Sequence, residues 1–103
     1  MNQVERWARE IGQKIRRARK DREMVQADIA KELGLSIEGV SSMERGSRLI
    51  GLEHILRLPA ILGCRITDLL PDEVVTNYDR RRAADPRLQE NSRRMGRSTG
   101  FST

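Results

Sequence analysis

Hydrophobic residues recur at helical spacing through the first two-thirds of the chain. Over residues 4–22 they are separated by steps of four, four and three, at Trp7, Ile11, Ile15 and Ala18. Such steps place side chains on one face of an α-helix, and the basic residues of this segment fall on the other faces. The pattern predicts one long amphipathic helix that ends near residue 22.

Two shorter helices are predicted next, because residues that end and begin helices divide the sequence. Residues 26–33 form a short helix with Ile29, Ala30 and Leu33 on one face. Gly34 follows, where a residue in the left-handed conformation commonly stops a helix. Ser36 is a good N-cap for a third helix that continues to Arg45. Gly46 then stops that third helix.

A fourth helix is predicted from Leu52 to Gly63, followed by a short turn over Ile66–Leu70 that Pro71 closes. Pro59 lies inside the fourth helix, where it removes a backbone donor, so we expect a kink or an early break there. No segment alternates with a period of two residues, which excludes strands of useful length. The expected fold is all-α, with five short helices.

The periodic pattern fails after residue 72. From Asp79 onward the composition is dominated by Arg, Asp, Ser, Gly and Asn, with only scattered large apolar residues. Such a segment cannot bury enough apolar surface to offset the entropy of ordering it. We therefore expect one folded domain over residues 1–74 and a disordered basic tail over residues 75–103.

The charge distribution separates the two ends of the chain from its middle. The chain has 103 residues and a formal charge of +5, with net charges of +5 over residues 1–22, −4 over 23–78 and +4 over 79–103. Positive segments attract polyanions, of which nucleic acid is the commonest and an anionic membrane surface is the rival.

Composition excludes several other classes of protein. No apolar run approaches the roughly 18 residues that a membrane span needs. One cysteine, Cys64, and one histidine, His54, provide neither a disulfide nor a Cys/His zinc site, so no metal or cofactor is expected. With no glycine-rich phosphate loop and no catalytic constellation, the chain is not expected to be an enzyme. We expect a cytoplasmic, nucleoid-associated protein.

Residues 26–46 combine these elements as helix, tight turn and helix. The sequence resembles the lambda-repressor/Cro type of helix-turn-helix family, also called the XRE family, over about residues 8–71. The matching positions are Gln26, Ile29, Ala30, Gly34, Leu35, Ser36, Val40, Ser41, Glu44 and Gly46, with Leu62-Gly63 and Asp68-Leu69-Leu70 at the close. The sequence departs from the family at Val25, Met43, Ile50 and Pro59.

The resemblance implies that the third helix lies in the major groove of DNA. The DNA-binding candidates are Gln26, Ser36, Ile37, Glu38, Gly39, Ser41, Ser42, Arg45 and Arg48. Gln26 is expected either to bind phosphate or to brace the third helix. Glu38 is either a base reader or a surface acid that suits the helix dipole. Since the helix offers only short or acidic side chains to the groove, modest direct readout of the bases is expected.

The resemblance also implies one ion pair, between Arg19 near the end of the first helix and Glu44 at the end of the third. Both residues stand at matching positions, and the pair would hold the third helix at its docking angle.

The sequence therefore predicts a sequence-specific, double-stranded-DNA-binding transcriptional regulator, a repressor that acts as a homodimer on a palindromic operator. A surplus of apolar residues predicts a dimer interface at Leu58, Ile61, Leu62, Leu69, Leu70 and Val74. The alternative is a protein-interaction adaptor or antitoxin-type partner built on the same fold. Separately, the basic tail is expected either to contact DNA phosphates or to bind a protein partner.

Overall fold

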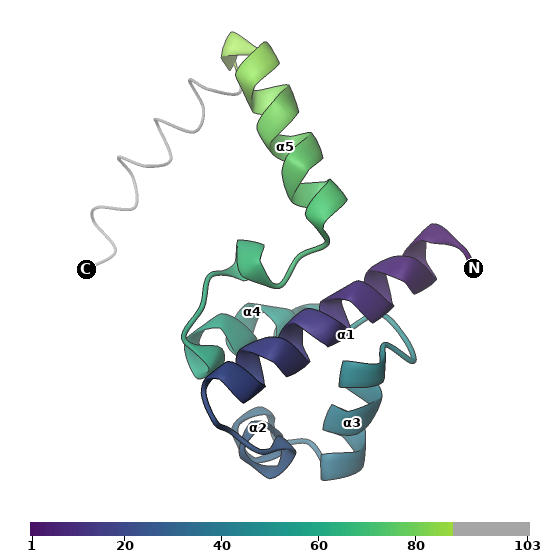
Figure 1. Ribbon diagram of the computed structural model, residues 1–103, viewed down its shortest axis with the longest axis vertical. Coiled ribbons are helices and arrows are strands. Elements are labelled where there is room, and N and C mark those ends of the chain that lie inside the picture. The colour runs from purple at the N-terminus through teal and green to yellow at the C-terminus, as the bar shows by residue number, and fades with distance from the viewer. Residues whose placement is uncertain (88–103) are drawn as a thin grey trace. The chain divides into compact units, whose positions relative to one another are not determined.

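The computed structural model describes residues 1–87, which divide after Pro71 into two units. The first unit holds four α-helices and a short 3-10 helix, and the second unit holds one more α-helix (Figure 1). These elements are α1 (Gln3–Asp21), α2 (Gln26–Leu33), α3 (Ile37–Arg45), α4 (Leu52–Leu62), η1 (Ile66–Asp68) and α5 (Asp72–Ala84). All regular structure in the described residues is helical, which confirms the predicted all-α fold with five helices.

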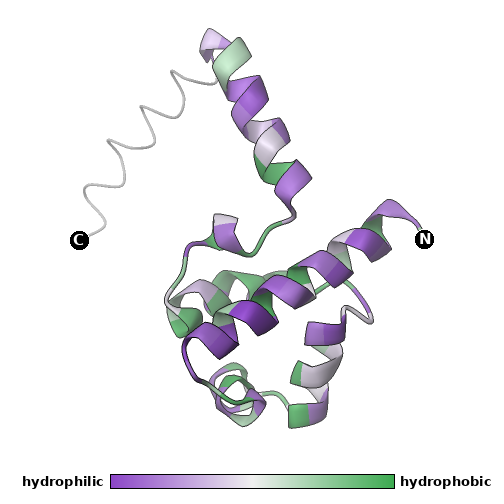
Figure 2. Cartoon of the chain, viewed as in Figure 1, coloured by the Kyte–Doolittle hydropathy of each residue, from purple (hydrophilic) through white to green (hydrophobic). Residues whose placement is uncertain are grey.

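The core of the first unit is built from the apolar faces that the sequence pattern predicts. α1 packs against α3, and α2 packs against both α3 and α4. In Figure 2 most of the ribbon of α1 has the colour of hydrophilic residues, and its apolar residues Ile11 and Ile15 are buried. The side chains with almost no exposed surface are Ile15, Ile29, Val40, Leu58, Leu62 and Leu69.

Local capping explains where the central helices begin and end. The Ser36 Oγ accepts a hydrogen bond from the Gly39 N–H at 3.0 Å and so caps α3. Val25 has no side-chain oxygen to cap α2, but the Asp28 carboxylate accepts from the Val25 N–H at 2.9 Å. Gly34 ends α2 in the left-handed conformation, with φ of 69°, and thereby makes the tight turn.

Pro59 does not break the fourth helix, contrary to that part of the sequence prediction. α4 continues to Leu62 and ends at Gly63, whose N–H donates to the Pro59 carbonyl. Because Pro59 is only three residues from the helix end, the missing donor affects the last turns alone.

The region after Pro71 also differs from expectation. Before Pro71, the predicted closing turn over 66–70 is the 3-10 helix η1. After Pro71, α5 extends over residues that the sequence predicts to be a disordered tail. Acidic residues in the first turn of α5 and Arg81 and Arg82 in its last turn complement the helix dipole, and Arg and Ala have high helix propensity. The remainder of the predicted tail, residues 88–103, lies outside the described residues.

The structure corrects half of the predicted dimer interface. Leu58, Leu62 and Leu69 are at most 2 % exposed and form part of the core of a single chain. The surplus of apolar side chains is smaller than the sequence suggests, because these three pack in one buried cluster with residues of α1, α2 and α3. Ile61, Leu70 and Val74 are half-buried, and their place in an interface stays a prediction.

Candidate nucleic-acid interface

The site is built on a close crossing of α1 and α3, which sets the angle of α3. A Cβ atom added at Gly12 of α1 would lie 2.5 Å from the Glu44 carbonyl oxygen and 2.6 Å from the Met43 carbonyl oxygen. A Cβ atom at Gly46 would lie 2.5 Å from the Arg9 Cα. Only residues without a Cβ allow the two backbones to approach this closely.

A buried ion pair fastens this crossing. Arg19 donates from Nε to Glu44 Oε2 at 2.7 Å and from Nη2 to Glu44 Oε1 at 3.0 Å. Arg19 also donates to the Met24 carbonyl at 2.9 Å, and both charged residues are buried. The hydrogen bond that Arg19 donates to Glu44 raises the pKa of the guanidinium, so it stays charged. The structure thus brings together the pair that the family resemblance implies.

Gln26 joins the same network. Its Nε2 donates to Glu44 Oε1 at 3.1 Å. The Glu44 carboxylate therefore links the end of α3 to both α1 and α2. The sequence predicts that Gln26 either binds a DNA phosphate or braces the third helix, and this contact is of the second kind. One N–H of its amide remains for a further acceptor.

The outer face of α3 presents an apolar and an acidic side chain near its N-terminus. Ile37 is 55 % exposed, and the Glu38 side chain is 85 % exposed with Arg45 4.0 Å away. Arg45 folds back along the helix, donating to Ser41 Oγ at 2.6 Å and to Ser42 Oγ at 3.2 Å. The guanidinium of Arg45 therefore orients both hydroxyl groups on this face.

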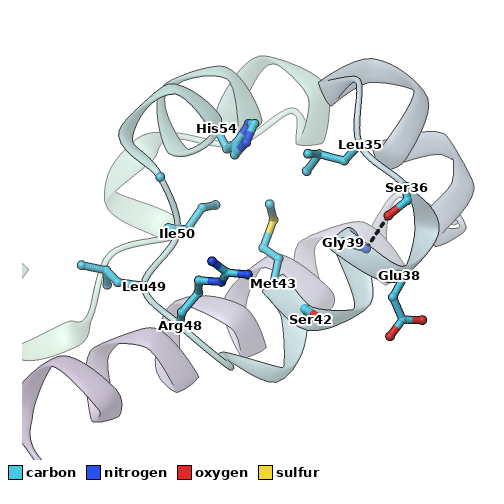
Figure 3. Close-up of a pocket in the computed structure, with 11 residues that line it drawn as sticks. Leu35, Ser36, Glu38, Gly39, Ser42, Met43, Arg48, Leu49, Ile50 and His54 are labelled. Carbon is cyan, nitrogen blue, oxygen red and sulfur yellow. Dashed lines mark hydrogen bonds between the residues drawn. The ribbon is translucent and has the colours of Figure 1, made fainter.

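One side of α3 borders an apolar pocket of about 630 Å³. Figure 3 shows Leu35, Met43, Ile50 and His54 around its interior, while Glu38, Ser42 and Arg48 line it from α3 and the following loop. The His54 Nδ1 is buried and has no hydrogen-bond partner within residues 1–87. Three predicted DNA contacts thus line this pocket: Ser36, Gly39 and Arg48.

The opposite side of α3 borders a polar groove of about 570 Å³, which we call the α1–α3 groove. Ser41 and Arg45 line it from α3, and Gln26 lines it from α2. Its remaining lining residues are Arg9, Gln13, Arg16, Arg19 and Glu44. The face of α3 that carries the predicted base contacts therefore runs between an apolar pocket and a basic groove.

Sequence reasoning did not single out Arg9, Gln13 and Arg16 as site residues. The available signal was their spacing of four and three, which places them on one face of α1 beside Arg19. Many basic residues on α1 obscured that signal, because spacing alone does not tell which of its polar faces borders α3.

Comparison with known families decides the class of this fold. The helix-turn-helix family (HTH_3) matches residues 15–69, which include the pair α2 and α3 and most of the core. The chain belongs to this helix-turn-helix family, of the XRE/Cro type. The helix-turn-helix unit is a DNA-binding domain of the kind found in transcriptional regulators, which are typically not enzymes. No curated protein matches the sequence significantly.

Solved structures resemble the helix-turn-helix domain. The restriction-modification controller protein C.AhdI from Aeromonas hydrophila is 30% identical, with a TM-score of 0.57 over 61% of this chain and 96% of that one. The DNA-binding domain of BldD is 23% identical, with a TM-score of 0.58 over 69% of this chain and 100% of that one. The S. venezulae BldD DNA-binding domain is 24% identical, with a TM-score of 0.56 over 64% and 99%. At these identities, the two BldD domains show a shared fold with this chain.

Two properties of residues 1–87 bear on the function. No helix in this part is long and apolar enough to cross a membrane. No group of three or more His, Cys, Asp or Glu side chains in this part is arranged to hold a metal ion.

Proposed function

We propose that the protein is a sequence-specific transcriptional repressor that binds double-stranded DNA as a homodimer on a palindromic operator. The observation that carries this proposal is the exposed outer face of α3, held at a fixed angle by the buried pair of Arg19 and Glu44. A helix presented in this way can enter the major groove, which is the docking mode of helix-turn-helix proteins. The similarity to a restriction-modification controller protein supports a role in gene control.

Base readout in this proposal comes from the exposed edge of α3. The apolar Ile37 side chain suits a thymine methyl group, and the exposed Glu38 carboxylate can accept from a cytosine amino group. Gly39 lets the helix backbone approach the bases. Ser36 and Ser42 lie beside it along the apolar pocket, and Ser41 lies along the α1–α3 groove. Arg45 and Arg48 are exposed and serve phosphates, and Gln26 has one amide hydrogen left for a phosphate oxygen.

An exposed apolar face supports the homodimer. Leu49, Leu52 and Leu56 are 46 %, 72 % and 58 % exposed, and they lie on α4 and on the residues that lead into it. Apolar side chains grouped in this way mark protein interfaces. The proposed interface therefore centres on these three residues, with Ile61, Leu70 and Val74 as further predicted contacts. A twofold arrangement would set two copies of α3 about one DNA turn, roughly 34 Å, apart.

Selection of bound duplexes from a random pool, followed by footprinting on the DNA upstream of the protein's own gene, tests the proposal. The expected result is a palindromic site whose half-sites are about 10 base pairs apart. Reporter transcription from that site should fall when the full chain is present. Enrichment of no sequence over random DNA would overturn sequence-specific regulation.

The second candidate function is a protein-interaction adaptor or an antitoxin-type partner. The highly exposed Glu38 on the outer face of α3 favours it, because a carboxylate at this place repels DNA phosphates. Under this alternative, Glu38→Gln weakens binding of a protein partner and changes no base preference. Under the leading proposal, the same variant changes the preferred base in the operator.

A further inference from the structure

We infer that the α1–α3 groove is a binding site for a phosphate of the DNA backbone, with Arg9 and Arg16 as its charged contacts and Gln13 as a hydrogen-bond donor. The inference rests on the proposed binding of DNA and adds a contact region on α1. It assigns a role to three exposed side chains that no base contact explains.

The charge inside the groove calls for an anion. Four of its eight lining residues are arginines, and Glu44 is its only acid. The Glu44 carboxylate already accepts from Arg19 and Gln26, so its charge is neutralised within the protein. Arg9 and Arg16 form no hydrogen bond or ion pair with any of residues 1–87, and both are exposed. Guanidinium groups bind phosphate oxygens through pairs of N–H donors, which makes a phosphodiester a suitable occupant.

The position of the groove selects a backbone phosphate of DNA over other phosphates. Ser41 and Arg45 line the groove and also belong to the outer face of α3. The major groove is about 12 Å wide, close to the diameter of a helix, so a docked α3 has a phosphate backbone along each side. Arg48 lies on the pocket side of α3, and Arg9 and Arg16 lie on the opposite side. The phosphate backbone of each DNA strand thus faces arginine side chains.

The same face of α1 then has two roles along its length. Arg9, Gln13, Arg16 and Arg19 follow one another in steps of four, three and three. Arg19 is buried and holds α3, whereas the first three are exposed and open to the groove. A phosphate bound by Arg9 and Arg16 would therefore be fixed relative to α3, because one helix positions both. Such a contact sets orientation and carries no sequence information.

The test compares full-length Arg16→Ala with full-length Arg17→Ala. Both variants lack one exposed guanidinium at neighbouring positions of α1, but Arg17 does not line the groove. Binding to a random-sequence duplex and to a selected duplex is measured by fluorescence anisotropy over about 50–200 mM salt. Removing one phosphate contact flattens the slope of log K against log salt by about 0.9, a difference of about 3.5-fold in affinity across that range. Circular dichroism checks that each variant is folded.

Arg16→Ala should flatten the slope on both duplexes and keep the preference between them, and adding Arg9→Ala should flatten it again. Arg16→Lys should recover most of the salt dependence, because it keeps the charge. Equal slopes for Arg16→Ala and Arg17→Ala, with wild-type DNA binding intact, would overturn the groove and leave the proposed function standing. Failure of the wild-type protein to bind either duplex would overturn both.

Discussion

Arg19 and Glu44 form a bidentate, hydrogen-bonded ion pair, with N···O distances of 2.7 Å and 3.0 Å, that joins the end of α1 to the end of α3. Both side chains are buried, and Gln26 bonds to the same carboxylate from α2. Three helices therefore depend on one buried charge pair. A buried charge left without its partner is costly, so this network fixes the helix arrangement more strongly than exposed pairs do.

Arg19→Ala should lower the free energy of unfolding by about 2–4 kcal/mol, because Glu44 would remain buried with only Gln26 as a partner. Chemical denaturation of Arg19→Ala, Glu44→Ala and the double variant measures the coupling, which should be about 1–3 kcal/mol. The exposed pair of Glu53 and Arg57, 3.7 Å apart on α4, is a control with an expected coupling of about 0.3–0.5 kcal/mol. A coupling no larger than that of the control would contradict the role of the pair.

Gly12→Ala should destabilise the first unit by about 1–3 kcal/mol, because its Cβ would overlap backbone atoms of α3. Those atoms are carbonyl groups of Met43 and Glu44, so no side-chain rotation relieves the overlap. Thermal unfolding compares this variant with Gly39→Ala, whose Cβ would meet nothing closer than Ser36 Oγ at 3.4 Å. An unchanged stability for Gly12→Ala would mean that α1 and α3 can separate at little cost.

Gly39→Ala should have opposite effects on stability and on DNA binding. Replacing a helical glycine with alanine stabilises a helix by about 0.5–1 kcal/mol, and the site has room for the methyl group. If the backbone at Gly39 approaches the bases, the same methyl group weakens binding to the selected operator. Denaturation and anisotropy on one sample measure both quantities. A stabilised variant with unchanged affinity would place Gly39 away from the DNA.

The helix-turn-helix region was predictable because its signals are local. The turn at Gly34, the cap at Ser36 and the apolar positions Ile29 and Val40 each act within a few residues, and the structure has all four in the expected roles. α5 was missed for the opposite reason. It has no buried side chain, so it leaves no apolar periodicity to detect, and its helical order rests on propensity and dipole complementarity.

The surroundings of α3 could not be derived from spacing alone. Arg9 and Arg16 look like any solvated basic residues in the sequence, and only the packing of α1 on α3 places them in one groove. Similarly, the sequence does not distinguish Leu56 from Leu58 on α4, yet Leu56 is 58 % exposed and Leu58 is fully buried. Which face of a short apolar helix turns inward depends on its tertiary partners.

Leu52→Asp and Leu56→Asp should convert a dimer into a folded monomer, because each puts a charge into the proposed apolar interface. Both side chains are exposed in the single chain, so the fold should tolerate them. Sedimentation velocity reports the oligomeric state, and circular dichroism confirms helicity. Ile61→Asp and Val74→Asp test the further predicted contacts in the same way. Dimers that persist in all four variants would place the interface elsewhere, such as near Trp7 of α1.

The C-terminal segment should add affinity for DNA without adding specificity. Residues 79–103 contain seven arginines and a net charge of +4, and three of the arginines, Arg80, Arg81 and Arg82, belong to α5. If two to four arginines contact phosphates, truncation after Tyr78 should flatten the salt slope by about 2–3.5 per chain. The preference for the operator over random DNA should survive, since phosphate contacts carry no sequence information.

Truncation after Arg87 separates the contribution of α5 from that of the residues beyond it. This variant keeps α5 and removes Arg93, Arg94 and Arg97, which lie outside the described residues. Anisotropy over the same salt range for both truncations then divides the slope between the two segments. If Arg80–Arg82 supply the phosphate contacts, the truncation after Arg87 should keep the wild-type salt slope, and the truncation after Tyr78 should flatten it. A wild-type slope in both variants would show that this segment does not touch DNA, and would favour a protein partner for Leu88, Met95 and Phe101.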